Sequence, residues 1–269
     1  MKVCVLGSGS SGNATLVVAD GVSVLIDAGL SCRQIVRRME SVGASPRSLD
    51  AVFITHEHRD HIAGLPTLVK RFDPAVHVTE ATASAAGPAI NGTGRVQFVQ
   101  AGVSCRLGPM EIHPFSVAHD ATDTVGYVVS DGDVSVGIAT DLGFVSAIVR
   151  HWLRGCDLAI VEANHDPQML RNSRYPWQIK QRIASRHGHL SNTDCAALVA
   201  DLVPDGTRCV VLAHISEENN IPELAVQTVE EELATRGFGD MHLLTAIQSE
   251  PTPVITVRPD GVKTAQTLV

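Results

Sequence analysis

Aromatic side chains are scarce in this chain: they make up 4% of its 269 residues, whereas 44% of the residues are hydrophobic. The core must therefore be built mainly from Val, Leu, Ile and Ala, and the chain is long enough to fold alone. The cysteines form no CxxC pair, which argues against a zinc or redox motif of that type and predicts reduced, mostly buried thiols. No hydrophobic run reaches membrane-spanning length, and the apolar run near the amino terminus is too short for a signal-peptide core. We therefore expect a cytoplasmic protein with no membrane partner.

Acidic residues are missing from one stretch of an otherwise acidic chain. The formal net charge is −8, which by itself disfavours a polyanionic partner. Residues 167–193, here called the basic island, contain no Asp or Glu but hold Arg171, Arg174, Lys180, Arg182, Arg186, His187 and His189. These cations could follow a nucleic-acid backbone, and Tyr175 and Trp177 could stack on unpaired bases. The alternative is a solvated helix with Trp177 packed inward.

Hydrophobic periodicity predicts two β-rich stretches, each followed by helices. Strands are expected at Lys2–Leu6, Ala14–Ala19, Ser23–Asp27, Ala51–Ile54, Val76–Thr79, Val96–Val99, Val103–Leu107, Met110–Val117, Tyr127–Ser130, Val134–Ala139, Leu158–Val161, Cys209–Ala213 and Val254–Val257. Helices are expected from a Ser31 cap to Val42, and at Gly64–Phe72, Ile179–Arg186, Asn192–Leu202 and Pro222–Thr235. No linker or repeat divides the chain, so we predict one domain over residues 1–269, of the α/β class, with helices covering the outer faces of the sheets.

A run of metal-ligating residue types follows the strand expected at Ala51–Ile54. It reads Thr55-His56-Glu57-His58-Arg59-Asp60-His61. In an extended chain His56 and His58 fall on the same side, and Asp60 and His61 can reach a second position where the chain curls. Imidazole and carboxylate suit Zn²⁺, Mn²⁺ or iron, and no nearby cysteine could close a structural zinc site. The run predicts a two-metal site; the alternative is a polar surface loop.

Such a site needs further ligands, and three residues qualify because each lies just past the end of a later expected strand. They are His119, Asp141 and His214. In layered α/β folds, sites gather at the carboxyl ends of strands. Each residue alone is weak evidence, but together with the histidine-rich run they predict a dinuclear centre.

With these residues the chain resembles the metallo-β-lactamase superfamily, whose HxHxDH motif is present at residues 56–61. The resemblance spans nearly the whole chain and implies a four-layer αββα fold with two central mixed sheets. It also implies two divalent metal ions, for which Zn, Mn and Fe all stay open. The implied ligands are His56, His58 and His119 for one ion and Asp60, His61 and His214 for the other, with Asp141 as the bridge.

Three further motifs resemble the YycJ (WalJ) branch of this superfamily: LGSGSSGN at residues 6–13, VEANHD at residues 161–166 and GHLSN at residues 188–192. That branch is associated with 5′-to-3′ exonuclease activity on DNA. Its members lack the β-CASP domain of ribonuclease J, and this chain likewise has no insert long enough for one. The resemblance implies a phosphodiesterase in which two cations about 3.5–4 Å apart hold a bridging hydroxide and clamp the phosphodiester.

Two residues are expected to act in catalysis. Asp60 could orient the attacking hydroxide through its free carboxylate oxygen. His189 resembles the histidine of a Gly-His motif that contacts the scissile phosphate in related nucleases, and we expect it to stabilise developing charge and to protonate the leaving oxygen. It is placed at the start of a predicted helix, where backbone N–H groups add anion affinity. The alternative is a capped turn with a solvent-facing histidine.

Other residues are candidates for substrate contacts or for support of the ligands. Asp27 resembles a position that supports a ligand by a hydrogen bond. For Asn164 and His165 we expect such support or a phosphate contact, with purely structural roles as the alternative. The remaining candidates are Ser8, Ser11 and Asn13 in the glycine-rich loop, which could also be only a turn, and Arg182 and Arg186, which should share one helical face.

The residues favour a dinuclear metal-dependent phosphodiesterase, a 5′-to-3′ exonuclease with DNA rather than RNA as its nucleic-acid partner. One alternative is a metallo-hydrolase of the same fold for a small molecule, such as a cyclic phosphodiester, thioester or lactone. Another is a non-catalytic, metal-binding regulatory protein. A steep loss of activity with salt would separate the nuclease from a hydrolase of neutral substrates. The sequence leaves the native metal and the oligomeric state open.

Overall fold

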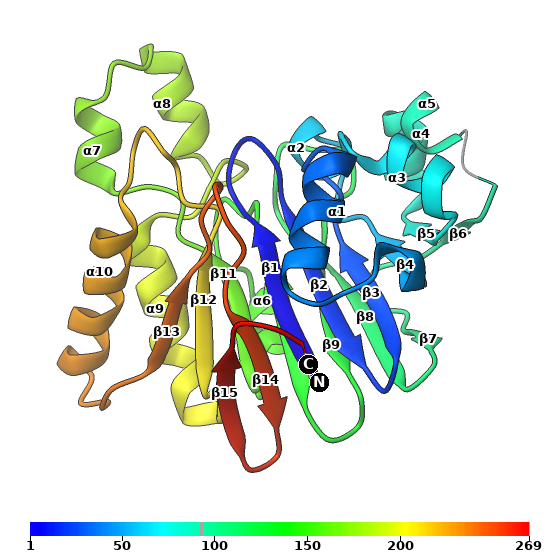
Figure 1. Ribbon diagram of the computed structural model, residues 1–269. Coiled ribbons are helices and arrows are strands. Elements are labelled where there is room, and N and C mark those ends of the chain that lie inside the picture. The colour runs from blue at the N-terminus through cyan, green and yellow to red at the C-terminus, as the bar shows by residue number, and fades with distance from the viewer. Residues whose placement is uncertain (92–93, 269) are drawn as a thin grey trace.

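Alternate residues of the strands point toward two different apolar layers. In β1 (Lys2–Gly7), Val3 and Val5 join a cluster between the sheets, whereas Cys4 and Leu6 join a cluster beneath helices. The computed structural model describes residues 1–91 and 94–268. Their strands form two sheets packed face to face, with helices on both outer faces (Figure 1). This arrangement confirms the predicted αββα sandwich with two mixed sheets.

Among the described residues, the first sheet has eight strands in the order β15-β14-β1-β2-β3-β4-β5-β6. Besides β1 these are β2 (Ala14–Ala19), β3 (Val22–Ile26), β4 (Ala51–Phe53), β5 (Ala75–Val78), β6 (Val96–Phe98), β14 (Val254–Arg258) and β15 (Gly261–Ala265). Neighbours are antiparallel from β15 to β3 and parallel from β3 to β6. The parallel part carries the histidine-rich run at the end of β4.

The second sheet has seven strands within the described part of the chain, in the order β13-β12-β11-β10-β9-β8-β7. They are β7 (Cys105–Leu107), β8 (Met110–Ser116), β9 (Val125–Ser130), β10 (Ser135–Ala139), β11 (Leu158–Glu162), β12 (Cys209–Ala213) and β13 (His242–Thr245). Strands β10 to β13 are parallel, and β7 to β10 are antiparallel. The predicted hairpin at Asp131-Gly132 joins β9 and β10.

Helices bury apolar stripes against the outer face of each sheet. The first sheet is covered by α1 (Cys32–Ser41), α3 (Leu65–Phe72), α4 (Glu80–Ala86) and α5 (Pro88–Asn91), and the second by α6 (Ala147–Leu153), α9 (Asn192–Leu202) and α10 (Pro222–Thr235). Ser31 and Ser191 cap the first turns of α1 and α9 with their side chains. Two further helices, α7 (Pro167–Asn172) and α8 (Trp177–Ile183), extend beyond the second sheet at the upper left of Figure 1.

Most predicted strands and the capped helices agree with the structure to within a few residues. Five helices and two strands were not predicted from the sequence: α2 (Arg59–Ile62), α4, α5, α6, α7, β13 and β15. These helices are too short to show a clear 3.6-residue period, β13 has only four residues, and β15 is largely exposed and polar. The 3₁₀ turns at Pro46–Ser48 and Val203–Asp205 were missed for the same reason.

The cysteines agree with the expectation of mostly buried thiols. All six cysteines are free, and five of them are buried, with Cys105 half-buried. In the described part of the chain, no helix combines the length and the hydropathy that a bilayer crossing needs.

Candidate metal centre

The histidine-rich run changes conformation in the middle. His56 and His58 lie in the extended segment after β4, and His58 is the N-cap of α2. Asp60 and His61 lie in the first turn of α2. Because the chain curls between the two pairs, their side chains reach two neighbouring positions, as the spacing predicts.

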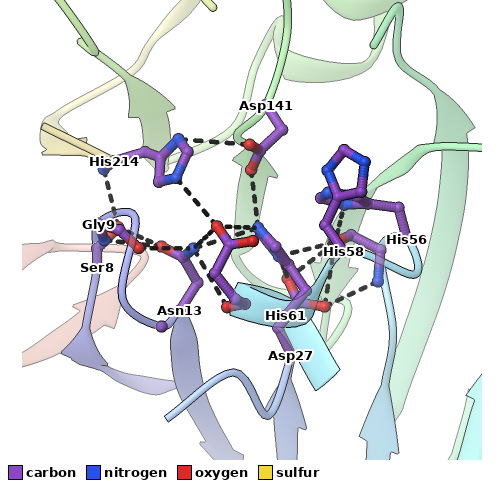
Figure 2. A network of polar contacts seen from close by, with 12 residues as sticks. Ser8, Gly9, Asn13, Asp27, His56, His58, His61, Asp141 and His214 are labelled. Carbon is purple, nitrogen blue, oxygen red and sulfur yellow. Dashed lines mark hydrogen bonds and ion pairs between the residues drawn. The ribbon is translucent and has the colours of Figure 1, made fainter. Parts of the chain in front are cut away.

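Three residues from the second sheet complete the cluster. His119, Asp141 and His214 follow β8, β10 and β12. Figure 2 shows Asp141 directed toward His61 from the opposite sheet. His214 Nε2 lies 3.5 Å from Asp60 Oδ2. Among the described residues, potential ligand atoms within 4.8 Å of one another form three groups: His56, His58 and His119; Asp60, His61, Asp141 and His214; and Asp141, Glu162, His189 and His214. The first two groups contain the residues expected as ligands. The structure thus brings together every ligand that the resemblance implies.

Asp141 lies between the two groups and is only 2% exposed. Its Oδ2 is 3.1 Å from His61 Nε2. Its Oδ1 is 3.7 Å from His119 Nε2 and 3.4 Å from His214 Nδ1. One carboxylate therefore reaches members of both groups, which is the position that a bridging ligand needs.

Three buried ligand-type atoms of this cluster lack a hydrogen bond, although two of them lie 3.1 and 3.5 Å from another ligand-type atom. Within the described residues, His56 Nε2, Asp141 Oδ2 and His214 Nε2 make no hydrogen bond. Leaving a buried polar atom unpaired costs about 1–3 kcal/mol, so such atoms need an explanation. Imidazole and carboxylate groups together are a ligand set that zinc, manganese and iron accept. The residues therefore fit divalent metal ions.

The electrostatics of the cluster also favour cations. Burial raises the pKa of Asp141, but His214 and His61 outweigh this and hold it well below its usual value. Burial lowers the pKa of His61, but Asp141 and Asp27 outweigh this and raise it well above its usual value. Burial and neighbouring His61 lower the pKa of His56, which keeps that imidazole neutral and able to ligate. The centre therefore holds ionised carboxylates beside imidazoles.

Asp27 fixes the orientation of His61 from behind. His61 Nδ1 donates to Asp27 Oδ2 at 2.8 Å. Asp27 Oδ1 also accepts hydrogen bonds from the backbone N–H and the hydroxyl of Thr55, at 2.9 and 3.0 Å. A carboxylate on Nδ1 sets the tautomer that leaves Nε2 free for a metal. Asp27 thus makes the supporting contact that the resemblance implies.

The glycine-rich loop holds potential ligands with its buried side chains. Ser8 Oγ accepts from the backbone N–H of His214 at 2.8 Å and donates to Asn13 Oδ1 at 2.9 Å (Figure 2). Asn13 Nδ2 lies 3.2 Å from His61 Nε2. Ser11 is exposed, and its backbone N–H donates to a side chain outside the loop. Ser8 and Asn13 were expected to contact substrate. In the structure their polar side-chain atoms instead contact other groups of the protein.

Glu162, at the end of β11, is a site residue that was not predicted from the sequence. It is fully buried, and its Oε1 accepts hydrogen bonds from His214 Nδ1 at 2.6 Å and His189 Nδ1 at 2.9 Å. Its Oε2 accepts the backbone N–H groups of Leu142 and Leu190 at 3.0 and 2.9 Å. The sequence feature that could have indicated Glu162 is an acidic residue at the end of an apolar strand, within the VEANHD motif. Glu162 joins His189 to the second ligand group.

His189 lies at the open side of the cluster, with 21% of its side chain exposed. Its ring centre is 5.2 Å from those of both His119 and His214. Burial lowers its pKa, but Glu162 outweighs burial and raises it. The expected place at a helix start needs correction, because His189 precedes Ser191, the N-cap of α9, and lies outside the helix.

Three of these residues have left-handed backbone conformations. The φ angles of Asp27, Asp141 and His214 are 64°, 56° and 52°. Residues with a side chain rarely adopt this region, and each instance costs about 1–3 kcal/mol. All three directly follow or nearly follow a strand, so the turn redirects their side chains into the cluster. Such strain concentrates at functional sites.

Asn164 and His165 differ in their surroundings. Asn164 Nδ2 donates to the backbone carbonyl of His214 at 2.9 Å, so Asn164 supports a ligand-bearing loop. His165 is buried and lines a cavity beside α7 and α8. Asn164 and His165 were expected either to support a ligand or to contact a phosphate. The hydrogen bond of Asn164 to His214 is of the supporting kind.

Arg182 and Arg186 do not share a helical face, so that prediction was wrong. Helix α8 ends at Ile183, and the chain turns back at Gly188, where a Cβ would lie 2.2 Å from the carbonyl oxygens of Arg182 and Ile183. Arg182 Nε pairs with Asp120 at 2.5 Å. The guanidinium of Arg186 lies 4.0 Å from the ring centre of Phe144.

Comparison with known proteins places this geometry in a family. Residues 23–215 match the model of the beta-lactamase superfamily domain. The chain is 36% identical to exodeoxyribonuclease YycJ of Bacillus anthracis over 87% of this chain and 90% of the relative, and 36% identical to exodeoxyribonuclease WalJ of Streptococcus pneumoniae over 88% and 90%. The metallo-β-lactamase fold protein YhfI of Bacillus subtilis, 17% identical, superposes with a TM-score of 0.72 over 93% of this chain and 98% of that one. The chain belongs to the metallo-β-lactamase superfamily, in the branch of YycJ and WalJ.

Proposed function

We propose that this protein is a metal-dependent exodeoxyribonuclease that uses two divalent ions and degrades DNA in the 5′-to-3′ direction. The observation that carries the proposal is Asp141, whose carboxylate reaches both groups of ligand-type side chains. The activity in the names of the YycJ and WalJ relatives supports DNA as the substrate. The basic island beside the site supports a polyanion rather than a neutral small molecule.

The proposed ligands divide between two ions. His56, His58 and His119 would hold one ion, Asp60, His61 and His214 would hold the other, and Asp141 would lie between them. When bound, a pair of divalent ions supplies an activated water and clamps the oxygens of the phosphodiester. The chain's own contribution is to fix the imidazoles: Asp27 holds His61, and Glu162 holds His214.

His189 is the proposed proton donor. Its Nδ1 is held by Glu162, so Nε2 is the ring nitrogen left for substrate. Burial lowers the pKa of His189, but the Glu162 carboxylate outweighs burial and raises it, because it stabilises the protonated imidazole. A cation there can bind the developing phosphate charge and pass a proton to the leaving oxygen.

The test is degradation of 5′-labelled and 3′-labelled single-stranded DNA and RNA by metal-stripped protein refilled with Mn²⁺ or Zn²⁺. We expect metal-dependent release of mononucleotides from the 5′ end of DNA. His189→Ala should lower the rate about 10²–10⁴-fold, the usual contribution of a general acid. His187→Ala is the matched control, since His187 is an exposed histidine of the same turn.

Each outcome has a definite meaning. Release from the 3′ end would contradict the polarity, and faster degradation of RNA would contradict the choice of DNA. Protein that binds two equivalents of metal but cleaves neither polymer would overturn the nuclease and favour a small-molecule hydrolase of the same fold.

A further inference from the structure

A cavity of about 450 Å³ lies beside the metal centre, between α7, α8 and the segment that follows β11. His165, Leu170, Arg171, Trp177 and Lys180 are among its lining residues. Sites for small ligands generally measure 300–1,000 Å³ and combine apolar walls with a few polar groups. This cavity has that size and that mixture, and none of the roles assigned above uses it.

One wall of the cavity is an unpacked indole. Trp177 is 66% exposed, so it does not pack inward as the alternative reading of the basic island required. Leu170, which is buried, lies in the same lining. An exposed tryptophan beside an apolar side chain is a stacking surface for a flat ring, and such stacking contributes to single-strand binding whatever the base.

The cations of the lining have no acidic neighbour to neutralise them. Neither Arg171 nor Lys180 makes an ion pair within residues 1–91 and 94–268. Lys180 Nζ donates to the carbonyl oxygens of Arg171 and Ser173, both at 2.7 Å, which fixes the ammonium but leaves its charge uncompensated. Arg182, by contrast, is paired with Asp120. The cavity thus presents two cations suited to a phosphate group.

His165 connects the cavity to the metal centre. It is 3% exposed, and its Nδ1 has no hydrogen-bond partner among the described residues. Its neighbour Asn164 binds the carbonyl of His214, and its own carbonyl accepts the N–H of Asn192, just after the turn that carries His189. The segment that lines the cavity is therefore hydrogen-bonded to the segment that follows the proposed proton donor.

We propose that this cavity binds one nucleotide of a single DNA strand, next to the phosphodiester that is cut. The base stacks on Trp177, and the adjoining phosphate lies between Arg171 and Lys180. This proposal rests on the nuclease function for its choice of ligand. A base in this cavity must be unpaired, so the enzyme selects a single-stranded end or a frayed one.

The first test measures binding, not cleavage. Metal-loaded protein is titrated with phosphorothioate-linked oligodeoxythymidylate, which resists hydrolysis, and tryptophan fluorescence is recorded. Stacking should quench Trp177, and Trp177→Phe should remove most of the change, because the other tryptophan, Trp152, is not part of the cavity lining and packs near Phe115. A blunt duplex of equal length should quench far less. No quenching at saturating single strand would overturn the proposal.

The second test compares affinities among variants of equal melting temperature. Trp177→Ala and Arg171→Gln should each raise the Kd for the single strand about tenfold, in line with the usual loss of one stacked base or one phosphate contact. Arg174→Gln is the matched control, because Arg174 belongs to the basic island but not to the cavity lining, and it should change Kd less than twofold. Equal effects of Arg171→Gln and Arg174→Gln would show diffuse attraction instead of a nucleotide site.

The third measurement separates this proposal from the nuclease function itself. Bis(p-nitrophenyl) phosphate is a phosphodiester without a base or a strand, so its hydrolysis tests only the metal centre. Trp177→Ala should keep wild-type kcat/KM for this ester while its KM for DNA rises. If the wild type hydrolyses neither substrate, the nuclease fails while the quenching still reports on the cavity. If Trp177→Ala loses both activities equally, Trp177 has a structural role and the nucleotide site is wrong.

Discussion

Single carboxylates decide which nitrogen each buried imidazole can offer to a metal. His61 Nδ1 donates to Asp27, and His214 Nδ1 donates to Glu162, so in both rings Nε2 keeps its lone pair. The first contact agrees with the resemblance drawn from the sequence. The second was not predicted, because Glu162 sits in a fully buried strand and only the parallel pairing of β11 with β12 places it behind His214.

Glu162→Gln should weaken metal binding by roughly 10–100-fold, the usual effect of losing a carboxylate behind a ligating histidine. An amide nitrogen facing His214 Nδ1 would force the ring proton onto Nε2 and remove the lone pair. The measurement is competition for Zn²⁺ with a chromophoric chelator. Glu230→Gln, an exposed acid on α10, is the control and should leave the affinity unchanged. Unchanged affinity in Glu162→Gln would show that the tautomer is set by other contacts.

Backbone contacts between three separate loops decide where α2 sits. Asn13 N donates to the carbonyl of Asp60 and Ala28 N to that of His61, both at 2.8 Å, while Gly29 N donates to Asn13 O at 2.9 Å. The position of the two ligands on α2 is therefore set by loops from the ends of β1 and β3. Apart from the presence of glycines, no local sequence pattern indicates these contacts.

Gly29→Ala should displace α2, because a Cβ at this position would lie 1.6 Å from the carbonyl oxygen of Asp60. Overpacking of this kind costs about 1–3 kcal/mol or more, which corresponds to a fall in Tm of roughly 3–12 °C. Calorimetry with and without Zn²⁺ should show a lower Tm and a smaller metal-induced rise. Gly239→Ala meets no atom within 4 Å and should be neutral. A wild-type Tm and metal response in Gly29→Ala would mean that the loops move apart freely.

The parallel strand β5 carries a histidine that should make stability depend on pH. His77 is 4% exposed, stacks on Phe53 with ring centres 4.2 Å apart, and burial lowers its pKa to about 4. The unfolded chain, with a histidine pKa near 6.5, takes up the proton first, so stability is complete above pH 6.5 and falls as pH drops toward 4. The loss is about 1.4 kcal/mol per pH unit.

His77→Phe should remove this part of the pH dependence. The free energy of unfolding is measured with urea from pH 7.5 to 4.5 for wild type and variant. The difference between the two proteins should change by about 2–3 kcal/mol across this range. His242→Phe changes an exposed histidine of β13 and is the control. Its free energy of unfolding should depend on pH in the same way as that of the wild type. If His77→Phe also shows the wild-type pH dependence, His77 is solvated in the folded protein.

At the scale of the molecule, the metal centre joins the two sheets. His56, His58, Asp60 and His61 come from the end of the first sheet, and His119, Asp141 and His214 from the second. Bound ions would therefore hold the two halves of the sandwich together. A ligand that binds only the folded state stabilises it by about 2.7 kcal/mol at a hundredfold excess over Kd.

Removal of the metal should lower Tm by roughly 5–10 °C. This range follows from the loss of about 2.7 kcal/mol of binding stabilisation in a chain of this size. Chelator-treated protein is compared with protein refilled with Zn²⁺ or Mn²⁺ by calorimetry. The rise should depend on metal concentration, and Asp141→Asn should abolish most of it because this residue reaches both groups. A Tm independent of metal would contradict a structural link between the sheets.

The sandwich should also protect its thiols. Burial raises the pKa of Cys4 to about 11 and those of Cys156 and Cys209 to about 12, so these thiolates scarcely form at pH 8. Titration with a disulfide reagent should modify at most the half-buried Cys105 in folded protein and every thiol after denaturation. Cys105→Ser should then abolish the native reaction. Rapid reaction of two or more thiols would show that the layers open readily.

The sequence by itself determined the fold class, the long capped helices and the identity of the ligand-type residues. Spacing carries this information, since strands alternate with period two and a histidine just past a strand lies at the sheet's carboxyl edge. Only the tertiary structure decided that Glu162 lies behind His214, that Ser8 holds a loop, and that Arg182 is neutralised by Asp120. These contacts join residues that are far apart in the chain. Strand register and close backbone packing at glycines bring the two partners of each contact together, and neither leaves a local pattern in the sequence.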